Sequence, residues 1–111
     1  MNFDLKWSPS EKKVARSAFD KALEVALGKV LAEFKKKASA AATFSDMWEI
    51  EDYLRQQQRN LERLFDYRYS QLIIVFASLI RKGYLDEKLL VGLSQDNRDE
   101  ISRFLAWHAR T

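Results

Sequence analysis

Carboxylate side chains and a single histidine are the residues of this sequence whose types and spacing could support catalysis or metal binding. Glu49, Glu51 and Asp52 lie close together, and on a helix positions 49 and 52 share a face while position 51 points elsewhere. No histidine accompanies them at the Glu-x-x-His spacing that holds di-iron sites in helical bundles. His108 stands three residues from the C-terminus, where a frayed end or a cation at a helix end is a better interpretation than acid–base chemistry. We therefore expect no metal site and no catalytic residues.

The composition lacks the parts that most other reactions need. The 111 residues contain no Cys and one His, which excludes disulfide scaffolds, thiolate zinc sites and cysteine nucleophiles and is compatible with a reducing compartment. The chain also lacks a glycine-rich phosphate loop, a dinucleotide fingerprint and a Ser-His-Asp arrangement. We expect a protein without a cofactor that is not an enzyme.

The basic residues do not form the continuous basic face that nucleic-acid binding requires. The net charge is only +3, although the pI is about 9.2. Carboxylates interrupt the arginines of residues 55–63 at four-residue steps, which is typical of ion pairs along a helix surface. The lysines of residues 35–37 are explained by a solvated helix end, where cations complement the helix dipole. We expect no nucleic-acid partner.

The elements that position these residues are predicted to be helices, because three Gly and one Pro are too few for the turns of a sandwich or barrel. Ser8-Pro9-Ser10-Glu11 has the pattern of a capping box, and an apolar stripe follows it to about Ala38. Ser45-Asp46 is predicted to open a second helix by the same logic. A bend is expected within residues 65–70, where Asp66 could cap a new helix.

The C-terminal half is predicted to fold into a compact head. Residues 72–80 are apolar on nearly all sides and should be wrapped by other helices, and Gly83 has the placement of a left-handed helix cap. A short helix over 86–91, Gly92 as its stop, and a last helix capped by Ser94 complete the pattern. The sequence thus predicts one all-α domain over residues 1–111, with a stalk hairpin over about 9–64 and a head over about 66–109.

Apolar and polar surfaces of the predicted stalk favour a homodimer. Hydrophobic residues make up 47% of the chain, more than a thin helical monomer covers. Residues 55–60 are polar on every face and must meet solvent or a partner chain. Residues 1–7 have no signal-peptide pattern, and the apolar stretch 72–80 is about half of a membrane span. We expect no integral membrane segment.

Trp48 is the residue with the strongest indication of function. It is predicted in the first turn of the second helix, where its ring could pack onto the first helix. Together with Asp52 and the arginines that follow, it also has the composition of a protein-binding hot spot. Both alternatives remain open, and one ring can satisfy both.

Three segments carry a resemblance to a known family. Residues 48–54 (WEIEDYL), 65–70 (FDYRYS) and 73–80 (IIVFASLI), the last followed by Gly83, resemble the fluorescence recovery protein family of cyanobacteria. The resemblance implies all-helical homodimers with an elongated stalk and a small head and without a cofactor. It also implies binding to the C-terminal domain of the light-activated orange carotenoid protein. Such binding accelerates the return of that protein from the red to the orange form and ends the quenching of phycobilisome fluorescence.

The same resemblance implies which residues contact the partner or the sister chain. Glu51 stands where the best-known members have histidine, and Gln58 stands where they have arginine, with Arg59 adjacent. The implied location is cytoplasmic, with association to the thylakoid surface through the phycobilisome. The alternative function is a helical dimer that serves as adaptor for an unrelated protein partner, with nucleic acid ranked below. The implied partner-binding and dimer-interface residues are Met47, Trp48, Glu51, Asp52, Gln58, Arg59 and Ile74.

Overall fold

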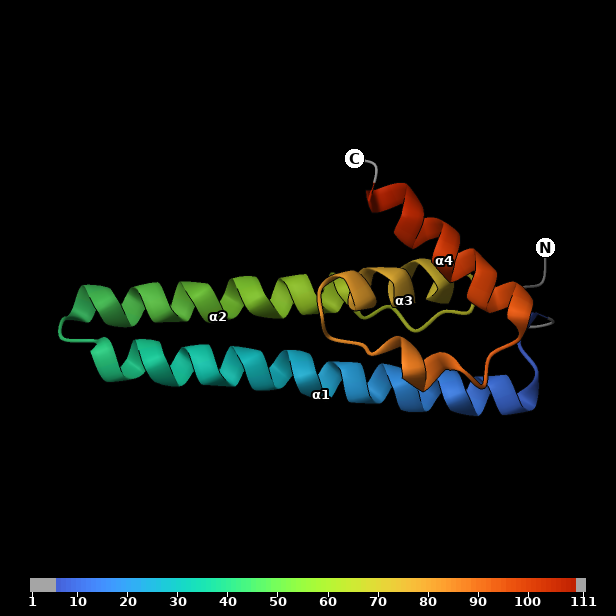
Figure 1. Cartoon of the computed structure of the whole chain (residues 1–111). Helices are drawn as coiled ribbons and strands as arrows, with labels where there is room; N and C mark the ends of the chain where they lie inside the picture. The colour runs from blue at the N-terminus through green and yellow to red at the C-terminus, as the bar shows by residue number, and fades with distance from the viewer. Residues whose placement is uncertain (1–5, 110–111) are drawn as a thin grey trace.

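The structure is a computed structural model that describes residues 6–109, with side chains described to residue 107. The described part is helical and contains no strand, as the sequence predicts. Two long antiparallel helices lie side by side, and the C-terminal elements gather against one end of this pair (Figure 1). The elements are α1 (Pro9–Ala40), α2 (Phe44–Leu64), α3 (Leu72–Arg81), the 3-10 helix η2 (Glu87–Leu90) and α4 (Gln95–Ala109).

The start of α1 follows the predicted capping box. The Glu11 backbone N–H donates to Ser8 Oγ at 3.2 Å, and the Ser8 backbone N–H donates to Glu11 Oε1 at 3.2 Å. Pro9 occupies the first position of the helix, where its missing N–H costs nothing. These local interactions fix the beginning of the longest helix.

The predicted start of α2 lies two residues too late, because Thr43 and not Ser45 is the N-cap. Thr43 Oγ1 accepts from the Asp46 backbone N–H at 3.1 Å, and Asp46 Oδ2 accepts from the backbone N–H groups of Thr43 at 3.1 Å and Ala42 at 2.8 Å. The hydrogen bonds from Ala42 and Thr43 hold the pKa of Asp46 below its usual range. Asp46 is therefore the third-position member of a capping box that turns the chain back at the tip of the hairpin.

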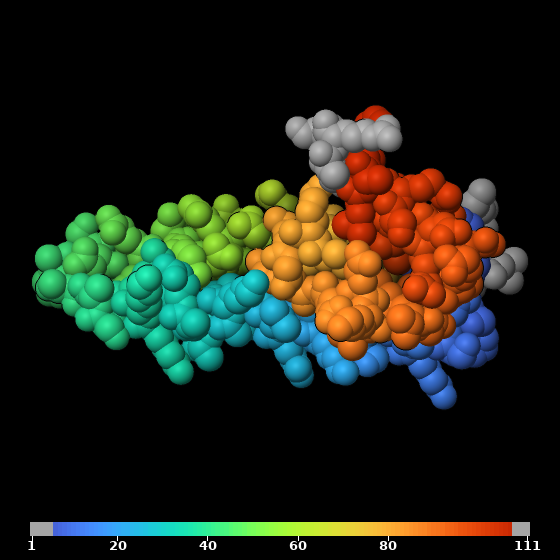
Figure 2. All heavy atoms as spheres, viewed as in Figure 1, coloured from blue at the N-terminus to red at the C-terminus, as the bar shows by residue number. Residues whose placement is uncertain are grey.

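The hairpin of α1 and α2 makes the molecule elongated, with extents of 53 × 31 × 26 Å. The radius of gyration is 16.9 Å, against about 13 Å for a compact domain of this length. No residue of α2 is fully buried, because only one face of this helix lies against α1. The space-filling view shows the hairpin as a narrow extension of a broader end (Figure 2).

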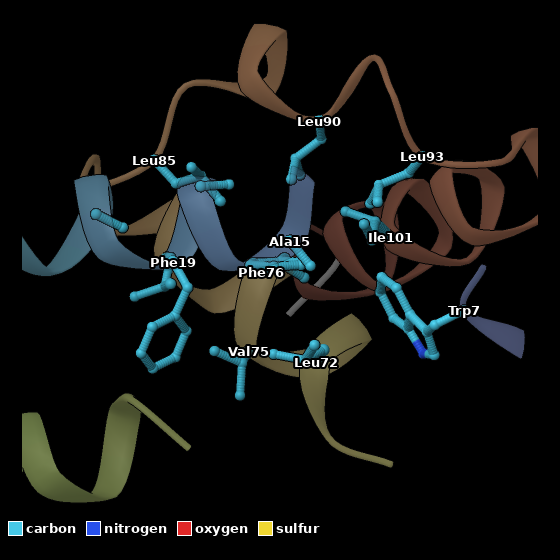
Figure 3. Packing of buried hydrophobic residues seen from close by; sticks show 14 residues of the cluster. Trp7, Ala15, Phe19, Leu72, Val75, Phe76, Leu85, Leu90, Leu93 and Ile101 are labelled. Atoms are coloured by element: carbon cyan, nitrogen blue, oxygen red, sulfur yellow. The ribbon is translucent and has the colours of Figure 1, made fainter. Parts of the chain in front are cut away.

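The hydrophobic core lies at the broader end, in the head. The first half of α1 contributes Ala15 and Phe19, α3 contributes Phe76, and Leu85, Leu90 and Leu93 cover them from the connecting segment (Figure 3). Leu72, Phe76 and Leu79 are the largest side chains that are fully buried. The prediction that residues 72–80 are wrapped by other elements is confirmed for these side chains, whereas Ile74 of α3 remains 43% exposed.

The connection between α2 and α3 differs from its prediction. Asp66 does not cap a helix but forms an ion pair with Arg68, and α3 begins only after Gln71, which makes no side-chain cap. The connection instead turns aromatic rings toward the first half of α1. The ring of Tyr67 lies 4.9 Å from that of Phe19, and the ring of Tyr69 lies 6.0 Å from that of Trp7. Burial of these rings decides the path of the chain here.

Two glycines allow the tight path of the segment that leads to α4. Gly83 adopts φ +79°, the left-handed conformation predicted for a helix cap. A Cβ at Gly92 would lie 2.7 Å from Val14 Cγ2 of α1, so this stop requires the absence of a side chain. Ser94 then caps α4 as predicted and accepts from the Asn97 backbone N–H at 3.2 Å.

Glu11 connects the starts of the two helices that meet in the head. Its Oε2 accepts from the Ser94 backbone N–H at 2.9 Å and from Asn97 Nδ2 at 2.8 Å. Burial raises the pKa of Glu11, but the hydrogen bonds from Ser94, Ser8 and Asn97 outweigh it and hold the pKa below its ordinary value of 4.5. One buried carboxylate thus caps α1 and ties α4 to it.

Candidate functional site

Large apolar side chains are exposed at the tip of the hairpin, in the first turns of α2. Phe44 is 81% exposed, Trp48 62% and Met47 51%. The Trp48 ring is therefore not buried against α1, which was one of the two interpretations of its position. Exposed aromatic and thioether side chains that gather in this way are typical of a protein-binding surface.

One side of α2 carries a mixed apolar and charged surface, which we call the outer face. It consists of Trp48, Asp52, Arg55 and Arg59, which recur at steps of four, three and four residues and so lie on one side of the helix. All four are exposed. Asp52 Oδ2 accepts from Gln56 at 3.1 Å, and Arg55 forms an ion pair with Glu51. The outer face is thus amphipathic and free to meet a partner.

The carboxylates near Trp48 interact along their own helix and do not converge on a cation. Glu51 and Asp52 each contact a side chain one turn further along α2. Within the described residues, no three His, Asp or Glu side chains are placed to hold a metal ion. The single histidine, His108, has a side chain outside the described part of the chain. Glu51 and Arg55 form an ion pair four residues apart along α2, as the spacing of their charges predicts.

The predicted polar band of residues 55–60 meets solvent in this structure. Gln58 and Arg59 are exposed, and only Gln57 is half-buried between the two helices. Lys37 of the lysine run lies 3.7 Å from Glu33 and 4.9 Å from the centre of the Tyr53 ring. These local contacts agree with a solvated helix surface rather than a basic patch.

An apolar hollow of about 380 Å³ lies between α1 and α2 where the hairpin joins the head. Sequence patterns predicted the apolar stripe of α1 but not that part of this stripe would remain uncovered. Leu31 of the stripe and Leu27 next to it are about half exposed. The hollow is lined by Leu23, Leu27, Val30, Leu54, Gln57, Gln58, Leu61, Glu62 and Phe65.

The structure does not bring all the expected site residues together. Met47, Trp48, Glu51, Asp52, Gln58 and Arg59 lie on α2, whereas Ile74 lies on α3 in the head, away from the tip of the hairpin (Figure 1). Trp107 near the end of α4 is 65% exposed and is not among the site residues expected from the sequence. A tryptophan in a helix gives no sign of its exposure without knowledge of what packs beside that helix.

Comparisons with known proteins agree with this architecture. The family described as "Photoprotection regulator fluorescence recovery protein" matches residues 7–105. A fluorescence recovery protein of Synechocystis sp. is 30% identical over 95 residues, which are 86% of this chain and 87% of that protein. No helix in the described part of the chain has the length and apolar character to cross a membrane.

Solved structures of this family share the fold over almost the whole chain. The fluorescence recovery protein of Fremyella diplosiphon matches with a TM-score of 0.84 at 31% identity, covering 95% of this chain and 99% of that one. The structure from Synechocystis sp. matches with a TM-score of 0.84 at 30% identity and the same coverage. The resemblance seen in the sequence is thereby confirmed, and the chain belongs to the fluorescence recovery protein family of photoprotection regulators.

Proposed function

We propose that this protein binds the photoactivated orange carotenoid protein, at its C-terminal domain, and accelerates the return from the red to the orange form. Membership of a family of photoprotection regulators supports this function. The observation that carries it is the outer face of α2, where Trp48 is 62% exposed beside a carboxylate and two arginines. A soluble monomer rarely leaves a tryptophan so exposed without a binding role.

The proposed action requires no cofactor and no covalent chemistry. A regulator accelerates a conformational return only if it binds the transition state between the two forms more tightly than the red form. A preference of about 1.4 kcal/mol gives a tenfold acceleration, so a few well-buried contacts suffice. The protein acts in the cytoplasm on this proposal, at the thylakoid surface where phycobilisomes are attached.

Trp48 and Asp52 are the residues of the outer face best suited to this contact. A tryptophan ring supplies a large apolar area with little conformational freedom to lose, and such residues dominate the binding energy of most interfaces. Asp52 makes one hydrogen bond within the chain, to Gln56, and so retains an oxygen for a donor on the partner. Both side chains project from one helix and reach a partner together.

The active form is proposed to be a homodimer. The chain exposes 7762 Å², whereas a compact protein of 13.0 kDa exposes about 6,300 Å². The surplus of about 1,400 Å² exceeds the roughly 800 Å² that each partner buries in a standard interface. The elongated hairpin adds to the exposed area, because α2 buries no residue fully.

Dark recovery of the carotenoid protein, followed by its absorbance after illumination, tests the function. We expect faster recovery with the wild-type protein. We expect Trp48→Ala to weaken the complex about 30-fold, which corresponds to a hot spot of about 2 kcal/mol, and Asp52→Leu to act in the same direction. Trp107→Ala is the matched control, because it removes an equally exposed tryptophan from the head.

Each outcome of this test is informative. No acceleration by the wild-type protein would refute the proposed function. Acceleration that survives Trp48→Ala but is lost with Trp107→Ala would keep the function and move the site to α4. Size-exclusion profiles of each variant separate a direct effect on binding from an effect on the dimer.

A further inference from the structure

The outer face of α2 carries its opposite charges in separate turns of the helix. Asp52 follows Trp48 near the tip, whereas Arg55 and Arg59 lie further toward the head. The steps along the helix axis are about 5 Å from Asp52 to Arg55 and about 6 Å from Arg55 to Arg59. Over most of the length of α2, no other described element lies beside the side opposite α1 (Figure 1). A partner on this side therefore meets one carboxylate and two guanidinium groups in a fixed order.

Glu51, at the edge of the outer face, keeps these charges apart. Two carboxylates are within reach of Arg55 on a helix, Glu51 four positions before it and Asp52 three positions before it. The ion pair forms with Glu51, between Arg55 Nη2 and Glu51 Oε1, while Asp52 Oδ2 accepts from Gln56 at 3.1 Å. Asp52 and Arg55 therefore do not neutralise each other on the face that a partner meets.

The contact with Glu51 leaves Arg55 able to bind a second carboxylate. A guanidinium group has five N–H donors, and the ion pair engages only one of its nitrogen atoms. The Arg55 side chain remains 65% exposed and that of Glu51 45%, and an exposed pair of this kind contributes little to the stability of a helix. A side chain that is already held loses less conformational freedom when it binds. Arg55 is thus preorganised for a partner.

Arg59 is the second cation of the outer face and is not neutralised within the chain. Among the described side chains, none forms an ion pair or a hydrogen bond with that of Arg59. A guanidinium group pairs with a carboxylate through two parallel hydrogen bonds. Two guanidinium groups one turn apart match two carboxylates about 6 Å apart, the spacing of residues one turn apart on a helix or two apart on a strand. The surface therefore fits an acidic pair.

We propose that Arg55 and Arg59 bind an acidic pair on the surface of the carotenoid protein, while Asp52 accepts from a donor beside that pair. Glu51 is a positioning residue in this arrangement, because it holds Arg55 and does not contact the partner. The order of the charges sets the direction of the partner along α2, with its donor toward the tip and its carboxylates toward the head. The inference rests on the proposed function and adds the chemistry of the partner's surface.

Dark recovery of the carotenoid protein, measured over a range of concentrations of this protein, tests the inference. Charge complementarity acts on encounter and specificity, so the arginines should set the concentration that gives half-maximal acceleration. We expect Arg59→Gln to raise this concentration about tenfold and Arg55→Gln/Arg59→Gln about 100-fold, since each removes hydrogen bonds between charged groups. The matched control is Lys36→Gln, which removes one charge from an exposed position of α1 and should leave the concentration unchanged.

Salt and an exchange of charges give readouts that a purely structural role would not move. Raising the ionic strength from about 0.1 to about 1 M shortens the Debye length from about 10 to about 3 Å, which should weaken the wild-type complex much more than that of Arg55→Gln/Arg59→Gln. The exchange Glu51→Arg/Arg55→Glu keeps an ion pair within α2 but places a carboxylate on the outer face. It should weaken the complex about 100-fold at an unchanged midpoint of thermal unfolding. Arg59→Gln breaks no contact within the described chain and decides the question if the exchange lowers stability.

The results separate this inference from the proposed function. No acceleration by the wild-type protein would refute the function itself. Acceleration in which the arginine variants match Lys36→Gln, or in which salt acts equally on wild type and Arg55→Gln/Arg59→Gln, would keep the function and overturn the acidic contact. Full binding by a folded exchange variant would leave Arg55 with a structural role only and overturn its part in recognition. A changed mass of Arg55→Gln/Arg59→Gln in sedimentation would assign the arginines to a contact between copies and overturn the inference as well.

Discussion

Removal of the charge on Glu11 should destabilise the head without touching any proposed binding surface. The carboxylate is 8% exposed and accepts hydrogen bonds from the backbone N–H groups of Ser8 and Ser94 and from Asn97 Nδ2, at 3.2, 2.9 and 2.8 Å. In Glu11→Gln an NH2 group, which cannot accept a hydrogen bond, replaces one of the two carboxylate oxygens. The loss is smallest when it replaces Oε1, which accepts only from the Ser8 backbone N–H, and Oε2 keeps its bonds from Ser94 and Asn97. The remaining contacts also lose the assistance of the charge.

The magnitude follows from the number and type of these bonds. A hydrogen bond to a charged group contributes about 1.5–3 kcal/mol and a neutral one about 1 kcal/mol. One bond lost and two weakened give a decrease of about 2–4 kcal/mol in the free energy of unfolding. Domains of this size have about 5–15 kcal/mol in total, so the midpoint of thermal unfolding should fall by about 10–20 °C.

The pH dependence of the same variant gives a second signature. Because the pKa of Glu11 in the folded protein lies below its ordinary value of 4.5, its stabilisation is complete above that value. It is lost as the pH falls through the folded pKa. The difference between wild type and Glu11→Gln should therefore be full at neutral pH and shrink in acid.

Urea unfolding followed by circular dichroism, at one protein concentration and several pH values, measures both effects. Glu24→Gln is the control, since it makes the same change at an exposed position of α1. Hydrogen exchange should show earlier opening of the first turn of α4 in Glu11→Gln. A loss equal to that of Glu24→Gln, or a difference that stays constant in acid, would refute the proposed connection between α1 and α4.

Three further changes test the packing of the head. Gly92→Ala should lower the free energy of unfolding by about 1–3 kcal/mol, because its Cβ would meet Val14 Cγ2 at 2.7 Å. The double variant with Val14→Ala should lose less than the sum of the two single changes; strict additivity in urea titrations would contradict the clash. Gly83→Ala should cost about 1–2 kcal/mol in the same measurement, because an L-residue is strained at φ +79°. Burial, with a contribution from Tyr69, raises the pKa of Tyr67 to about 12, so Tyr67→Phe should remove the latest tyrosine step of an alkaline absorbance titration. The folded pKa exceeds the ordinary value of 10.0, so wild type should lose stability as pH rises above 10 while Tyr67→Phe loses less.

Helix ends could be predicted from the sequence where a cap depends on residues within one turn. Ser8, Gly83 and Ser94 all behave as predicted, because a side-chain oxygen or a positive φ acts on the adjacent backbone. The start of α2 was misplaced because Thr43, Ser45 and Asp46 are all cap formers in sequence. The choice among them depends on the fit of the whole capping box.

The connection after α2 could not be predicted from its own residues. Asp66 has the type of a helix cap, but the contacts that decide this segment reach the other end of the chain. Tyr67 Oη donates to the Lys12 backbone carbonyl at 3.4 Å across 55 positions, and Arg16 lies 4.7 Å from the centre of the Tyr67 ring. Tertiary burial of aromatic rings therefore outweighs a local capping preference.

The candidate site was predictable in its residue types but not in its geometry. Trp48 with Asp52 could be recognised from spacing on one helix, since positions four apart share a face. The exposure of Phe44 and the hollow near Phe65 depend on how far α1 covers α2. That coverage follows from the crossing of two helices, which no local pattern specifies.

The expected site residues on α2 fall on two sides of the helix, a division that the sequence resemblance does not make. Trp48, Asp52 and Arg59 lie on the outer face, whereas Met47, Glu51 and Gln58 recur at steps of four and seven residues on a neighbouring side. If the proposed function is right, Trp48→Ala and Asp52→Leu should slow dark recovery while the mass in solution stays unchanged, because neither side chain is needed to hold α2 on α1. A change of mass in either variant would instead place the outer face between two copies of the chain.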